Sequence, residues 1–80
     1  MLENIFETKV LGSNTIFLDI PEEEYFINYN NLSEKAAEEI TCNYFKIKNK
    51  TGIPHVKHIH VIPNIHNVEI IIEVEKDGTN

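Results

Sequence analysis

The four histidines are the side chains of this sequence whose type and spacing could bind a metal ion. His55, His58, His60 and His66 all lie between residues 40 and 68, a stretch without any acidic residue. His58 and His60 are two positions apart, so on a β-strand both imidazoles point to the same face of the sheet. Two imidazoles and one nearby carboxylate would suit Zn²⁺, Ni²⁺ or Cu²⁺.

The carboxylate in this hypothesis depends on how the histidine strand pairs with the strand that follows it. Pairing Val61 with Val68 places His60 opposite Glu69 and leaves the histidines in water. The alternative, Ile62 with Val68, turns the histidines into the core, where imidazoles without partners are costly. We therefore expect the first register. The candidate metal ligands are then His58, His60 and Glu69. There are two alternatives: the histidines are simply solvated, or they form a pH-sensitive surface. Exposed histidines are common on strands, and two histidines separated by one residue are a weak motif for metal binding.

Cys42 is the only cysteine in the sequence, and its surroundings do not favour nucleophilic catalysis. A reactive cysteine needs a histidine or a helix N-terminus beside it, whereas Cys42 is expected in the middle of a helix among glutamates. The run Glu22–Glu24 is typical of a solvated turn and offers no separated acid and base. The three glycines are scattered and form no phosphate-binding loop. We therefore expect no enzymatic activity and no cofactor, with Zn or Ni at the histidines as the alternative.

The length and charge of the chain limit its class and its partners. Eighty residues form a single domain, 1–80. The net charge of −6 and the lack of any arginine argue against specific nucleic-acid binding, which depends on cations and on the arginine fork. No stretch approaches the ~18 apolar residues of a membrane helix. The N-terminus is unlike a signal peptide and the lone cysteine fits a reducing compartment, so we expect a cytoplasmic protein.

Charge is unevenly distributed along the chain. Residues 1–39 hold nine of the thirteen acids, residues 40–68 hold none, and acids return after residue 68. Folding can interleave these segments so that opposite charges meet. Alternatively, the protein has an acidic face and a basic rim, which would steer a charged partner.

A helix over residues 32–47 is the clearest element in the sequence. Asn31 or Ser33 can cap its start, and a glycine and a proline follow its end. Its apolar residues fall within one arc of ~140° on a helical wheel. That arc consists of Leu32, Ala36, Ala37, Ile40, Tyr44 and Ile47. Phe45 lies outside the arc, so it is either covered by a neighbouring segment or exposed as an aromatic anchor for a partner.

The outer side of this helix and the acidic, aromatic segment before it are the candidate partner-binding surfaces. Exposed aromatic side chains often dominate the binding energy of interfaces. The candidate residues are Phe45, Glu38, Cys42, Tyr25, Glu22, Glu23 and Glu24.

Alternating apolar residues predict strands before and after the helix. The expected ranges are 4–11, 15–20, 25–29, 55–62 and 67–75. The first two form a hairpin, in which a three-residue loop pairs Val10 with Ile16 and keeps the apolar side chains on one side. The alternative hairpin register pairs Glu7 with Leu18 and mixes the two faces.

These elements predict an α+β fold: a small, mostly antiparallel sheet of four to five strands packed by one central helix. The opening Asn4-Ile5-Phe6 with its turn at Gly12, and the segment Lys50–Pro54 after the helix, resemble ubiquitin at comparable places. The resemblance implies a β-grasp arrangement, and the segment 22–30 departs from it.

The composition and the candidate surfaces favour a small acidic protein that binds another protein, or itself as a dimer, through its helix face or an open sheet edge. An inhibitor of phage or bacterial origin, which occupies a nucleic-acid-binding surface on its target, fits the acid-rich composition. A domain that binds a metal or a small ligand through the strand histidines is the alternative.

Overall fold

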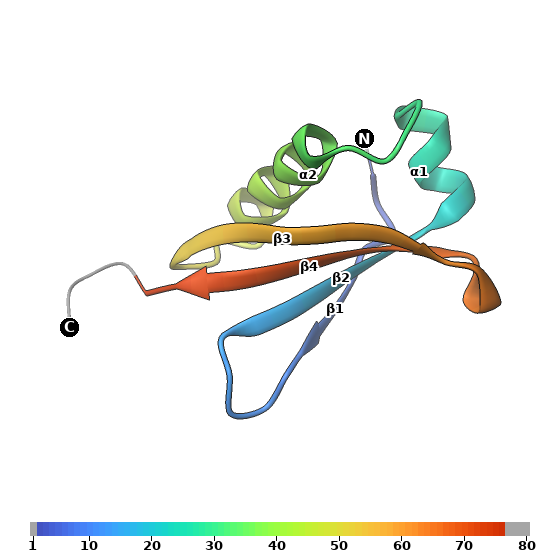
Figure 1. The fold of residues 1–80 in the computed structure, drawn as a ribbon. Helices are drawn as coiled ribbons and strands as arrows, with labels where there is room; N and C mark the ends of the chain where they lie inside the picture. The colour runs from blue at the N-terminus through green and yellow to red at the C-terminus, as the bar shows by residue number, and fades with distance from the viewer. Residues whose placement is uncertain (1, 77–80) are drawn as a thin grey trace.

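Four antiparallel strands form one sheet, and two helices pack on one of its faces (Figure 1). The computed structural model describes residues 2–76. The elements in chain order are β1 (Phe6–Lys9), β2 (Thr15–Pro21), α1 (Glu22–Asn28), α2 (Glu34–Ile47), β3 (Ile53–Ile62), a 3-10 turn (Pro63–Ile65) and β4 (Asn67–Glu75). The predicted α+β class is confirmed, with four strands and a second helix in place of the optional fifth strand.

The strand order is β1-β2-β4-β3. The two helices connect β2 to β3, and β4 then returns between those two strands, so the central pair of the sheet is β2 and β4. This order differs from the β-grasp arrangement that the resemblance to ubiquitin implies, and only the α+β class is shared.

The first hairpin has the register that the sequence analysis disfavoured. Glu7 pairs with Leu18 and Lys9 pairs with Ile16, so the predicted pairing of Val10 with Ile16 is wrong. The prediction rejected this register because it mixes polar and apolar side chains on one face. In the fold, the Glu7 carboxylate accepts a hydrogen bond from the hydroxyl of Tyr44 and lies beside Lys50. These two contacts offset the cost of an acid on the inner face.

Residues 22–28 form helix α1, so the strand predicted at 25–29 is wrong. The acids Glu22, Glu23 and Glu24 occupy the first turn, where their negative charges interact favourably with the helix dipole. Tyr25 and Tyr29 are four positions apart, a spacing that puts two side chains on one side of either a helix or a strand. Their rings stack with centroids 5.2 Å apart.

Helix α2 confirms the strongest prediction from the sequence. Ser33 is the N-cap, and its hydroxyl accepts a hydrogen bond from the backbone N–H of Ala36 at 3.1 Å. Four residues of the predicted arc are buried: Ala36, Ala37, Ile40 and Tyr44. Leu32, which lies before the helix, and Ile47, its last residue, remain partly or largely exposed.

The histidine strand pairs with the last strand in the predicted register. Val61 lies opposite Val68, Ile59 opposite Ile70 and His60 opposite Glu69. A bulge between Val56 and His58 adds one residue to β3. The predicted alternation of β4 is also confirmed, since Val68, Ile70 and Ile72 are fully buried.

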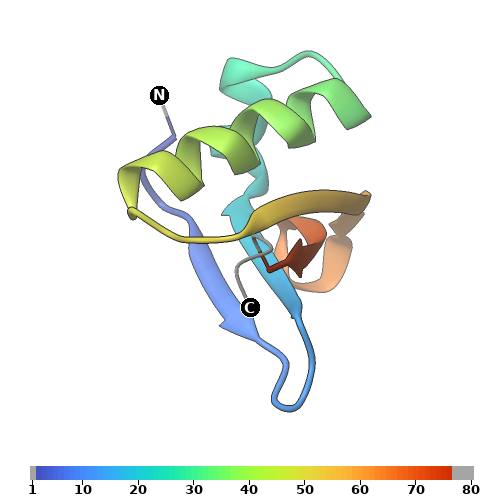
Figure 2. The ribbon, with the colours of Figure 1, turned by 90° about the vertical axis from the view of Figure 1, so that its left-hand side faces the viewer.

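The two faces of the sheet have different surroundings. Both helices lie on one side, as Figure 2 shows, and they cover the inner residues of β2 and β4. The opposite side carries no helix, and we call it the bare face. No helix in the described part of the chain is long and apolar enough to cross a membrane.

Candidate functional site: the bare face of the sheet

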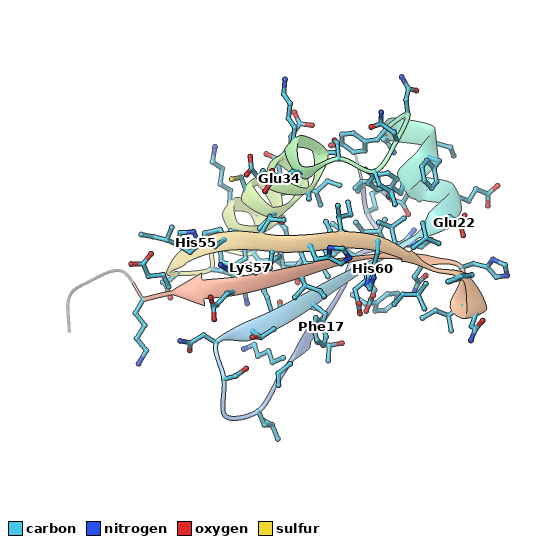
Figure 3. All side chains as sticks on the ribbon, in the orientation of Figure 1. Phe17, Glu22, Glu34, His55, Lys57 and His60 are labelled. Atoms are coloured by element: carbon cyan, nitrogen blue, oxygen red, sulfur yellow. The ribbon has the colours of Figure 1, made fainter. Side chains whose placement is uncertain are left out.

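The bare face is formed by every second residue of the four strands. Cross-strand pairing fixes which residues share it, because directly opposed residues point to the same side. Its central positions are Phe6 and Thr8 on β1, Phe17 and Asp19 on β2, Glu69 and Ile71 on β4, and His58 and His60 on β3. Figure 3 shows Phe17 on the opposite side of the sheet from Glu34 of α2.

A row of polar side chains crosses this face. Asp19 on β2 lies opposite Glu69 on β4, which lies opposite His60 on β3. The His60 Nε2 atom is 2.8 Å from Glu69 Oε1, a hydrogen-bond distance. Two carboxylates therefore lie side by side near the middle of the sheet, and an imidazole partners one of them.

Asp19 is the acid of this row without a cation of its own. Its Oδ1 atom is buried and has no hydrogen-bond partner among the described residues. Burial, followed by the charge and the hydrogen bonding of the neighbouring Glu69, raises the pKa of Asp19, and His60 only partly opposes this rise. These surroundings disfavour the ionised form of Asp19, and an added positive charge would favour it.

An apolar patch adjoins the polar row. Phe17 lies opposite Ile71, and Phe6, which lies opposite Asp19, is the diagonal neighbour of Phe17. Phe6 is 69% exposed, although phenylalanine is usually buried, and Phe17 and Ile71 are half-buried. No helix of the described residues covers these three side chains, so a partly exposed aromatic and aliphatic surface lies beside two carboxylates.

The structure brings the predicted metal ligands to the same face but does not arrange them as a metal site. The rings of His58 and His60 are edge to face, with centroids 4.8 Å apart, and Glu69 bonds to His60. Within residues 2–76, no three histidine, cysteine or acidic side chains form a group that could hold a metal ion. His55, nearer the start of β3, pairs with Glu75, and His66, after the 3-10 turn, lies beside Glu22.

Cross-strand charge pairs link β3 to β4. His55 Nε2 is 2.8 Å from Glu75 Oε1, and Lys57 Nζ is 3.7 Å from Glu73 Oε1. The acid-free segment of the sequence therefore lies directly against the acids that follow it. Within the sheet, the fold therefore interleaves the acidic and basic segments of the chain, which was the first of the two alternatives for the uneven charge.

Two of the predicted partner-binding residues are in the core and are not available to a partner. Phe45 is only 6% exposed, and the Nζ atom of Lys50 lies 5.9 Å from the centre of its ring. Tyr25 is fully buried, and its hydroxyl donates a hydrogen bond to the backbone oxygen of Asn31. The proposal of Phe45 and Tyr25 as exposed anchors is therefore wrong. The covering segment in the case of Phe45 is the loop that follows α2.

The remaining candidates on the helical layer keep some exposure. Glu38, Cys42 and Glu23 are exposed. Glu22 is half-buried near His66. Glu24 is half-buried, and its carboxylate accepts hydrogen bonds from the N-terminal segment, including the backbone N–H of Glu3. With Phe45 and Tyr25 buried, the exposed aromatic side chain beside Glu22 and Glu23 is Phe26, which is 39% exposed.

The sequence analysis missed Phe6, Phe17 and Asp19 as site residues. The wrong hairpin register placed Phe6 among the core residues, and Asp19 drew no attention as a single acid in an apolar strand. One signal was available in Ile71, which interrupts the polar outer pattern of β4 and proves to be the central aliphatic residue of the bare face. Comparison with protein-family models, with curated proteins and with solved structures finds no match for this chain.

Proposed function

We propose that this chain is a non-enzymatic protein-binding module that engages its partner through the bare face of the sheet. The observation that carries the proposal is the uncovered patch of Phe6, Phe17 and Ile71 beside the carboxylates of Asp19 and Glu69. Exposed aromatic side chains bury much area at little entropic cost, which makes them frequent interface hot spots.

The partner that fits this face is a basic protein surface. The Oδ1 atom of Asp19 has no hydrogen-bond partner among the described residues, and burial, followed by the charge of Glu69, raises the pKa of Asp19. A lysine or arginine from the partner, placed beside Asp19 and Glu69, would supply the missing charge while apolar groups cover Phe17. The narrower form of the proposal is inhibition: an acidic protein with net charge −6 occupies the nucleic-acid-binding surface of its target.

Substitution of Phe17 tests this proposal. Immobilised Phe17→Ser protein is compared with the wild type for the proteins that it retains from an extract of the native host. Leu11→Ser is the matched control, because Leu11 is exposed at the hairpin tip, away from the bare face. We expect Phe17→Ser to lose a retained basic protein that Leu11→Ser keeps, with unchanged circular dichroism in both. Equal retention by the two variants would contradict binding through the bare face.

A further inference from the structure

The outer edge of β3 differs from the other edge of the sheet. The opposite edge strand, β1, has four residues, whereas β3 has ten. The inner-face residues Ile59 and Val61 of β3 are only half-buried, although Ile70 of the adjacent strand is fully buried. The core is therefore incompletely covered along β3, and an additional strand at this edge would cover it.

Only part of this edge is protected against strand addition. Proteins protect exposed edges with prolines, charges and bulges, and β3 has all three in its first half, at Pro54 and at the bulge that contains Lys57. The second half, His58–Ile62, has no proline and no Lys, Asp or Glu. Pro63, which cannot donate a backbone hydrogen bond, follows directly. An unprotected stretch of five residues thus lies between two features that end a strand ladder.

We propose that a second copy of this chain pairs with this stretch in antiparallel orientation, centred on His60. The stretch is symmetric about His60, so a twofold axis places His60 of one copy opposite His60 of the other. Ile59 then lies opposite Val61 of the second copy, and each covers the exposed flank of the other's core. Lys57 lies opposite Pro63, so the ladder ends at the same point on both sides. The two sheets become one eight-stranded sheet with both pairs of helices on one side.

Charge favours a second copy at this edge over other approaches of two identical chains. Each copy carries a net charge of −6, so most surfaces bring acids together. The whole of β3 lies in the segment without acids, and its Lys57 and His55 side chains already lie beside acids of β4. A ladder between the two unprotected stretches opposes no two acids, and salt that screens the net repulsion should strengthen it.

The small size of the contact predicts a weak dimer. A ladder of five residues per copy buries much less than the about 1,200 Å² at which stable complexes begin. We therefore expect a monomer in dilute solution and a dimer at high protein concentration. This inference does not depend on the proposed partner at the bare face, because the ladder uses backbone groups at the edge and leaves Phe17 free.

Disulfide trapping tests the register directly. In a Cys42→Ser background, which removes the natural thiol, a His60→Cys variant is oxidised at high concentration. Opposed residues of an antiparallel pair have Cα atoms about 4.5–5.5 Å apart, within the range of a disulfide. We expect a covalent dimer for His60→Cys. A His55→Cys variant is the matched control: it is on the same exposed strand but outside the ladder, and should stay a monomer.

Sedimentation velocity of the unlinked protein gives the second readout. The wild type should show reversible dimerisation that strengthens with added salt. His60→Lys keeps a hydrogen-bond donor beside Glu69 but opposes two lysines at the axis, so the dissociation constant should rise by about fivefold or more, with His55→Lys unchanged. A monomer at millimolar concentration, or equal cross-linking at positions 55 and 60, would overturn the proposal. If Phe17→Ser still dimerises but no longer retains the partner protein, dimerisation through β3 and partner binding through the bare face are independent of each other.

Discussion

The two faces of the sheet handle polar groups in opposite ways. On the covered face, Glu7 is an acid beside the core: one of its carboxylate oxygens accepts a hydrogen bond from the Tyr44 hydroxyl at 2.8 Å, and the other forms an ion pair with the Lys50 ammonium at 2.9 Å. On the bare face, Asp19 is an acid beside another acid, and one of its oxygens has no partner among the described residues. A charge that is paired within the fold contributes to stability, whereas the incompletely paired Asp19 is the group that the proposed partner would complete.

The aromatic residues follow the same division. Phe45 packs under the helical layer, while Phe6 is largely exposed on the other side of the sheet. The chain thus places the same side chain once where it builds the core and once where water covers it. Matched substitutions on the two faces can therefore separate structural from recognition roles.

The largest difference should come from the two phenylalanines. Phe45→Ala should lower the free energy of unfolding by about 3–5 kcal/mol, because it leaves a cavity in a packed site. Phe6→Ala should change it by less than about 1 kcal/mol, since little buried area is lost. Urea unfolding followed by circular dichroism measures both. Similar losses for the two variants would show that the bare face is as tightly packed as the covered one.

Removal of the charge at Glu7 should have the next largest effect. Glu7→Gln should destabilise the protein by about 1–3 kcal/mol at neutral pH, because it breaks a charge-assisted hydrogen bond from Tyr44 and leaves Lys50 without its partner. Burial alone would raise the pKa of Glu7, but the hydrogen bonds from Lys50 and Tyr44 outweigh it and lower the pKa below its ordinary 4.5.

The pH dependence of this contribution has a definite sign. A carboxyl with a lowered pKa in the folded state stabilises the fold above its ordinary pKa, and the contribution is lost as the pH falls through the lowered value. The difference in unfolding free energy between the wild type and Glu7→Gln should therefore shrink in acid. A difference that stays constant from pH 7 to acid would contradict the role of the ionised carboxylate.

The sequence predicted the elements whose pattern is local. Helix α2 followed from one apolar arc and a serine cap, and the pairing of β3 with β4 followed from the requirement that apolar faces match. The failures involve contacts between residues far apart in the chain. Nothing near Glu7 shows that Tyr44 and Lys50 will pair with its charge. For Phe45 the helical wheel left two alternatives open, and the fold shows the covered one. The spacing of Tyr25 and Tyr29 fits a helix and a strand equally, so α1 could not be distinguished from a strand.

Asp19 should respond in the opposite direction to Glu7. Because burial and the charge of Glu69 raise the pKa of Asp19 in the fold, its ionised form costs stability above that raised value. As the pH falls through the raised pKa towards the ordinary 3.8, this cost disappears. Asp19→Asn should therefore stabilise the protein by about 0.5–1 kcal/mol at pH 7 and by less in acid. Destabilisation at pH 7 would show that the carboxylate has an internal partner.

The smallest effect should be that of Zn²⁺ on the histidines of the bare face. His60 already bonds to Glu69, and the described residues form no group of three ligands that could hold a metal. Two imidazoles alone leave a tetrahedral ion half solvated, which predicts weak binding. Calorimetric titration with Zn²⁺ should give no saturable heat at micromolar concentration, and His58→Ala should behave like the wild type. Saturable binding by the wild type that His58→Ala abolishes would favour the metal-binding alternative. It would mean that Glu69 gives up its hydrogen bond with His60 and binds the ion instead.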